Sequence, residues 1–256
     1  MSGKEVAATG ADDESFDPPR PFLEHISALR DALVGSAIAW LICCVIAGVF
    51  SQRVFVWIKT PAKNWQNMIQ GLDLTAGVDV IISIVLWGGT ALAFPFIAYH
   101  VLKFIFPALT KKERTLILGA LVVGVGLFGF GVWLAYAQTL PVIINVFQAI
   151  NEWIGLPVQT VRIEGYVKIV LKTIFAFGLV LQLPVILFLL GWLGVISSEA
   201  LRRWRRVAIV IIFILGMVLT PPDPMSQIIM AVPLCILYEI CVWSVWLKEK
   251  ACSRKA

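Results

Sequence analysis

Apolar residues fall into six uncharged runs along the chain, and short polar segments separate them. A helix needs roughly 17 to 25 mostly apolar residues to cross about 30 Å of bilayer hydrocarbon. The first four runs have such a length, so the pattern predicts an all-α polytopic membrane protein with six transmembrane helices. The runs are 32–50, 80–97, 116–137, 173–193, 207–219 and 228–247.

The fifth run, 207–219, is too short to cross a bilayer as an ordinary helix. Its 13 residues would rise only about 20 Å. Arginines precede it and the sequence Thr-Pro-Pro-Asp follows it, so polar residues mark both ends. A helix shorter than the hydrocarbon thins the bilayer locally at a modest free-energy cost. We therefore expect the hairpin of the fifth and sixth runs to thin the membrane.

The distribution of Lys and Arg predicts the orientation, because positively charged loops stay on the cytoplasmic side. With the N-terminus inside, 15 of the 21 Lys and Arg residues fall in cytoplasmic segments and 6 on the other side. Both termini are therefore expected to be cytoplasmic. The organisation that follows is a disordered acidic tail at 1–20, a transmembrane domain at 21–247 and a basic cytoplasmic tail at 248–256. No cleavable signal peptide is expected.

Composition excludes a soluble globular class, since 59% of the residues are hydrophobic and only 14% are charged. The net charge of +5 follows from the positive cytoplasmic loops and requires no nucleic acid. Five cysteines are an odd number, and four of them lie within the apolar runs. We interpret them as apolar filling residues, with no disulfide framework, metal site or cofactor.

Two apparent motifs do not indicate catalysis. The sequence GVGLFG at 124–129 matches a dinucleotide-binding pattern, but that pattern requires a preceding strand. We interpret these glycines, with Gly119, Ala120 and Gly131, as a small-residue face that lets another helix approach. His25 and His100 lie near the predicted cytoplasmic boundary without a nucleophile motif, so an enzyme is not expected.

Polar residues inside the runs are expensive in lipid and are therefore candidates for function. Gln182 lies next to Pro184 in the fourth run, and Glu239 lies in the sixth. Gln182 has two open interpretations, a helix-to-helix hydrogen bond within the bundle or a contact with a partner. For Glu239 we favour a protonated or paired packing residue.

Four motifs in order make the chain resemble the TatC family, the receptor subunit of the twin-arginine protein translocase. The resemblance runs from about 21 to 247 and implies short fifth and sixth helices. It also implies a bacterial inner-membrane location. The motifs are His-x-x-x-Leu-Arg (His25, Leu29, Arg30), FIFPALTKKER (104–114), FGLVLQLPV (177–185) and LTPPDPMSQ (219–227).

The resemblance implies reception of folded precursors, not catalysis. Twin-arginine signal peptides would bind on the cytoplasmic face at Glu113, because guanidinium groups pair well with carboxylates. Arg30 of the opening motif and Glu24 are further candidates for this site. Single-span TatA and TatB subunits would assemble near Gln182 and Pro184, in a receptor complex that is itself a homo-oligomer, with transport driven by the proton-motive force. Further motif positions are Phe104, Pro107, Arg114, Tyr166, Pro221, Pro222, Asp223 and Glu239.

Two positions depart from the family pattern. The family commonly has an acid where this chain has Ala28, and a Glu where it has Gln182. Glu24 lies one helical turn before Ala28, so its carboxylate could cover the site of the missing acid. The alternative is that Glu24 is a solvated charge at a helix start. An alternative function is a small-solute or ion secondary transporter, which predicts internal repeats and charged residues at the midplane. The chain shows no such repeat.

Overall fold

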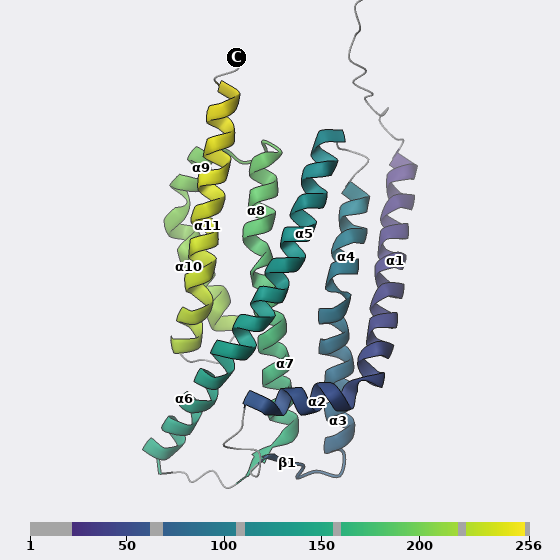
Figure 1. The fold of residues 1–256 in the computed structure, drawn as a ribbon, viewed down its shortest axis with the longest axis vertical. Helices are drawn as coiled ribbons and strands as arrows, with labels where there is room; N and C mark the ends of the chain where they lie inside the picture. Colours follow the sequence, from purple (N-terminus) through teal and green to yellow (C-terminus); the bar gives the residue numbers. More distant parts are fainter. Residues whose placement is uncertain (1–21, 62–68, 106–110, 156–159, 220–223, 254–256) are drawn as a thin grey trace, which may run out of the picture.

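A computed structural model describes residues 22–61, 69–105, 111–155, 160–219 and 224–253. The described segments are almost entirely helical (Figure 1). In chain order the elements are α1 (Phe22–Val49), α2 (Ser51–Lys59), β1 (Ile69–Gln70), α3 (Ala76–Ser83), a π-helical turn (Ile84–Gly88), α4 (Gly89–Ile105), α5 (Lys111–Leu134), a second π-helical turn (Ala135–Thr139), α6 (Leu140–Trp153), β2 (Val161–Arg162), α7 (Ile163–Val180), α8 (Gln182–Trp192), α9 (Ser198–Arg203), α10 (Arg205–Leu219) and α11 (Pro224–Ser253).

Each of the six predicted runs lies within helix, and five helical segments of the described chain are long and apolar enough to cross a membrane. These five are α1, the α3–α4 segment, the α5–α6 segment, the α7–α8 segment and α11. Helix α10 contains the fifth run and has only 15 residues. The short fifth helix is therefore as predicted.

The prediction of a short sixth helix is wrong. Helix α11 has 30 residues, which correspond to about 45 Å of rise. It begins before the apolar run and continues beyond it through Lys248, Glu249, Lys250 and Ala251. Lys, Glu and Ala are strong helix formers, so the helix does not end where the apolar sequence ends.

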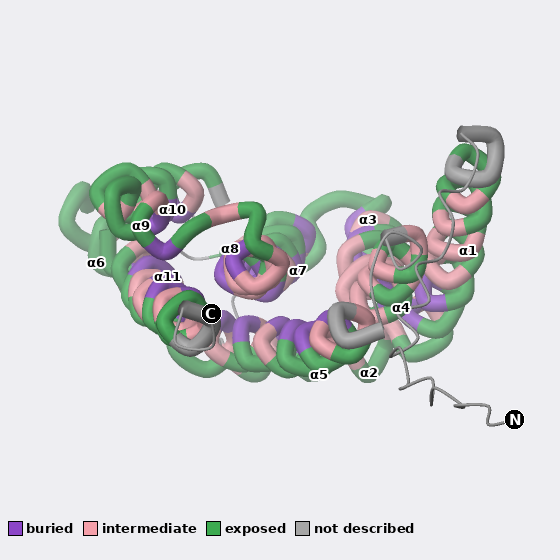
Figure 2. The backbone as a smooth tube through the Cα atoms, turned by 90° about the horizontal axis from the view of Figure 1, so that it is seen from above, coloured by how far each residue is buried: buried purple, intermediate pink, exposed green. Residues whose placement is uncertain are grey.

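The helices form a curved, open row when viewed along the bundle (Figure 2). Helices α1 and α4 lie at one side, α5 crosses the middle, and α9, α10 and α11 lie at the other side. Helices α7 and α8 lie between these two groups. The start of α1 and the end of α11 lie at the same end of the molecule (Figure 1), which we call the termini end.

Helix α2 was not predicted from the apolar pattern. It is a short amphipathic helix that lies across the end of the bundle opposite the termini end (Figure 1). Ile58 of α2 is fully buried, and its carbonyl accepts a hydrogen bond from the Tyr166 hydroxyl at 2.8 Å. The ring of Trp57 stacks on Tyr136 at 3.9 Å between centroids. These contacts hold α2 against the bundle.

A second unpredicted feature is a pair of two-residue strands at the same end as α2. Strands β1 and β2 are parallel, with Ile69 opposite Val161 and Gln70 opposite Arg162. The all-α prediction therefore holds except for this short ladder. Near it, Arg162 and Asp73 form an exposed contact at 3.5 Å.

Close packing between α5 and α7 depends on glycine. A Cβ atom at Gly131 would lie 2.8 Å from the carbonyl oxygen of Phe177, and one at Gly178 would lie 2.6 Å from the ring of Phe128. The predicted small-residue contact face is therefore confirmed for Gly131. At three other glycines an added Cβ atom would have no neighbour within 4 Å, so no helix of this chain packs closely on them. These are Gly119, Gly126 and Gly129.

Candidate functional site

The predicted peptide-binding residues belong to helices that meet at the termini end. Glu24 lies in the first turns of α1, and Glu113 lies in the first turn of α5. Both helices begin at this end, where α4 also finishes (Figure 1). The side chains of Glu24, His25 and Glu113 lie outside the described residues. The backbone thus brings these two acidic positions to one end of the bundle.

Of the other residues in this group, Arg30 is exposed and pairs with its neighbour Asp31, with Nη2 and Oδ1 3.0 Å apart. Phe104 lies in the last turn of α4 and Arg114 in the first turns of α5, both half-buried. Four motif residues lie outside the described residues. They are Pro107, Pro221, Pro222 and Asp223.

Gln182 lies at the start of α8 and is buried, with 9% of its surface exposed. Its amide nitrogen Nε2 donates to the carbonyl oxygen of Gly124 on α5 at 2.9 Å. Because Gly124 has no side chain, the Gln182 amide reaches the α5 backbone directly. Of the two interpretations of Gln182, the structure therefore contains the helix-to-helix hydrogen bond within the bundle.

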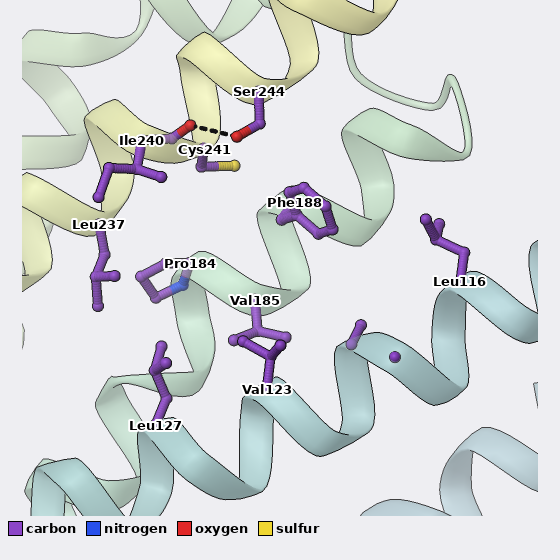
Figure 3. Close-up of a pocket in the computed structure, with 12 residues that line it drawn as sticks. Leu116, Val123, Leu127, Pro184, Val185, Phe188, Leu237, Ile240, Cys241 and Ser244 are labelled. Carbon is purple, nitrogen blue, oxygen red and sulfur yellow. Dashed lines mark hydrogen bonds between the residues drawn. The ribbon is translucent and has the colours of Figure 1, made fainter.

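Pro184 is buried one half-turn further along α8. It lacks an amide hydrogen, so the helix loses the bond that would otherwise reach the carbonyl of Val180. The fourth run correspondingly breaks into α7 and α8 at Leu181. Pro184 also lines an apolar groove between α5, α8 and α11 (Figure 3).

Glu239 is paired, as the packing interpretation expects. Its Oε2 lies 2.8 Å from Nη2 of Arg205, and both side chains are about two-fifths exposed. One position earlier on α11, the buried Tyr238 donates its hydroxyl hydrogen to the carbonyl of Leu201 at 2.7 Å. These two contacts fasten α9 and the start of α10 to the middle of α11.

Tyr166 has a structural contact that its sequence position alone did not define. It is buried on α7, and its hydroxyl reaches α2 through the bond to Ile58 described above. Tyr166 therefore connects a central helix with the amphipathic helix at the opposite end.

Sequence reasoning missed a polar cluster where α8, α9 and α11 meet at the termini end. Glu249 accepts a hydrogen bond from the Ser198 amide at 2.9 Å and a very short one from its hydroxyl. Lys248 donates to the carbonyl of Trp192 and lies 5.6 Å from its ring. The sequence predicts a basic tail for Lys248 and Glu249. Only the helix-forming residues at 248–251 indicated that α11 continues through them.

Taken together, these features define a multi-pass helical membrane protein with few buried polar groups. Within the described segments, no three His, Cys, Asp or Glu side chains gather in a way that could hold a metal ion. Residues 24–233 match the family described as Sec-independent protein translocase protein (TatC).

Relatives and solved structures agree with this match. TatC of Aquifex aeolicus is 33% identical over 225 residues, covering 87% of this chain and 93% of the relative. TatC of Escherichia coli K12 is 33% identical over 233 residues, covering 90% and 89%. A crystal structure of the twin arginine translocase receptor TatC superposes with a TM-score of 0.74 at 32% identity, covering 87% of this chain and 98% of that one.

The chain therefore belongs to the TatC family. It is a multi-pass protein of the bacterial inner membrane and a component of twin-arginine protein translocation. The resemblance inferred from the four motifs is confirmed, and membership of this protein-transport family displaces the solute-transporter alternative.

Proposed function

We propose that this protein is the receptor and core subunit of a twin-arginine translocase, and that it binds the signal peptides of folded precursors on the cytoplasmic face. In this proposal α10 enters the membrane as a sixth, short span, and the termini end faces the cytoplasm. The excess of Lys and Arg in the segments at that end supports this orientation.

The observation that carries the proposal is the meeting of α1 and α5 at the termini end, each with an acid near its start. A twin-arginine motif presents two guanidinium groups, each of which forms charge-assisted bonds with carboxylates. Glu113 is the principal carboxylate in this proposal, and Arg30 and Arg114 belong to the same surface. A carboxylate at a membrane boundary is partly desolvated, so its pairing is stronger than that of an exposed pair.

The test is binding of a twin-arginine signal peptide, and of its twin-lysine counterpart, to the purified protein in detergent. Wild type should prefer the twin-arginine peptide, because only guanidinium pairs bidentately. Glu113→Gln should lose more than the ~0 to 1 kcal/mol of an exposed ion pair. Glu152→Gln is the matched control, since Glu152 lies on α6 and contacts Gln148 at 2.9 Å. Equal binding by wild type and Glu113→Gln would remove Glu113 from this role.

Glu24 shares the arginine pair with Glu113 in this proposal, replacing the family acid missing at Ala28. Both positions lie in α1, four residues apart, so they present on one helical face. Glu24→Gln should weaken peptide binding, and adding Ala28→Glu should restore it. If Glu24→Gln leaves affinity unchanged at low salt, where such pairs are least screened, recognition does not involve Glu24.

We also propose that single-span subunits of the TatA and TatB type assemble against this bundle near Gln182 and Pro184, within a homo-oligomeric receptor complex. The support for this site is the family resemblance of the sequence FGLVLQLPV at 177–185, which contains both residues. Crosslinking from positions flanking Gln182 to such a subunit tests this assembly. Crosslinks confined to other helices would contradict it.

A further inference from the structure

An apolar groove runs between α5, α8 and α11 in the half of the bundle nearer the termini end (Figure 3). Its volume is about 450 Å³, within the range of ligand-binding pockets. Its lining is almost wholly carbon, including Leu116, Val123, Phe188 and Ile240. The Ser244 hydroxyl in its wall already donates to the carbonyl of Ile240 at 2.7 Å. The groove therefore has room for an apolar chain and no free donor inside it.

Beyond the lining residues, at the termini end, α8 and α11 carry Trp192 and the cation Lys248. Trp192 lies one turn beyond Phe188 on α8, and Lys248 lies one turn beyond Ser244 on α11, so both continue groove-facing rows. Lys248 donates to the Trp192 carbonyl, and an ammonium group has three hydrogens to donate.

This combination fits an amphiphile with an anionic head. Helix α8 ends at Trp192, which places Lys248 and the Trp192 indole at the level where a membrane protein meets lipid headgroups. The one nearby carboxylate on α11, Glu249, is turned toward α9, where Ser198 donates to it. The apolar side of a partner helix would offer the Lys248 ammonium group no acceptor beyond the Trp192 carbonyl. Basic pockets between membrane helices are typical sites for anionic lipid headgroups.

We propose that this groove binds one phospholipid with an anionic headgroup. An acyl chain lies against α5, α8 and α11, and the phosphate oxygens accept hydrogen bonds from Lys248 Nζ. The site is separate from the signal-peptide surface proposed above. It shares Pro184 with the proposed assembly site, so the lipid and a single-span subunit would meet at this groove.

The test is retention of lipid by the purified full-length chain, measured by native mass spectrometry after adding phosphatidylglycerol or phosphatidylcholine in mild detergent. Wild type should retain one phosphatidylglycerol in preference to phosphatidylcholine. Lys248→Gln should lower phosphatidylglycerol retention about fivefold. Lys250→Gln, on the same helix end, is the charge control.

A second variant tests the groove itself. A Cβ added at Gly119 meets nothing within 4 Å, and Gly119 lines the groove, so Gly119→Leu should fill it without a clash and reduce retention of both lipids. Gly126→Leu is the matched control, because Gly126 on the same helix is equally open but lies outside the groove. Equal retention of the two lipids by wild type, or equal losses in test and control variants, would overturn the proposal. So would a Gly119→Leu protein that keeps its lipid and instead loses crosslinks to a single-span subunit.

Discussion

The α7–α8 segment and α1 are both apolar enough to cross a membrane, yet they are held in the bundle in different ways. Half of the most apolar stretch of α7–α8 is buried in the protein, against 17% of that of α1. The α7–α8 segment contacts helices on several sides, including α3, α5, α10 and α11, whereas α1 packs chiefly on α4 and the π-helical turn before it. One segment is central and the other is attached along a single seam.

The difference shows what holds helices together in lipid. Hydrocarbon tails are as apolar as leucine, so association depends on close packing and on interhelical hydrogen bonds. Helix α1 has both along its seam. Gly35 faces the His100 ring, where an added Cβ would be 2.5 Å away. The Trp40 indole donates to the Thr90 hydroxyl at 2.9 Å. The central segment adds backbone-to-backbone contact at Gly131 and the buried Gln182 amide.

The largest effect is expected at the centre, from Gly131→Ala. The added Cβ would lie within 3.0 Å of backbone atoms of Phe177 and Gly178, which cannot rotate away. Overpacking of this kind costs about 1 to 3 kcal/mol. Gly129→Ala on the same helix has open space around it and should stay within about 0.5 kcal/mol of wild type. Thermal unfolding in detergent compares the two variants. Equal unfolding temperatures would show that the close contact between α5 and α7 does not contribute to stability.

A smaller effect is expected from Gln182→Leu. This change removes the bond from Nε2 to the Gly124 carbonyl, and such bonds contribute ~0.5 to 2 kcal/mol in a membrane. The free energy of unfolding of the isolated protein should fall by that amount. If Gln182→Leu instead leaves stability unchanged and abolishes crosslinks to a single-span subunit, the amide contacts a partner.

The smallest effect is expected at the seam of α1, from Gly35→Ala. The neighbouring atoms belong to the His100 side chain, which can move, so global stability should fall by less than about 1 kcal/mol. Hydrogen exchange should increase along α1 and leave α7 unchanged, because α1 can open alone. Gly48→Ala is the control on the same helix, with its nearest neighbour at an ordinary 3.4 Å. Faster exchange throughout the bundle would contradict the single-seam description.

The apolar pattern predicted the helices well, because membrane spans are long and every backbone group must bond within them. It did not predict α2, whose amphipathic sequence is short and whose position depends on Tyr166 and Trp57. The two-residue strands were not predicted for a similar reason, since Ile69 and Val161 pair across more than 90 positions of the chain. Small local patterns carry too little signal to identify such contacts.

The candidate site was predicted in part. The polarity of Gln182 and Glu239 inside apolar runs indicated that each needs a polar partner. Their partners, Gly124 and Arg205, depend on which helices are neighbours. Helix α11 extends past the apolar run, because the charged residues that follow the run are helix formers. Lys248 packs on Trp192, since a lysine at a helix end can direct its charge to the membrane boundary.

The two π-helical turns, Ile84–Gly88 and Ala135–Thr139, affect how the chain tolerates changes in length. A π turn closes its hydrogen bond over one more residue than an α turn, so it takes up an extra residue locally. The second π turn lies between α5 and α6. A continuous α-helix one residue shorter would therefore give α6 nearly the same orientation to α5. Deletion of a single residue within 135–139 should therefore leave Leu140 and Ile143 facing the core. The same deletion in the middle of α5 would rotate everything after it by about 100°.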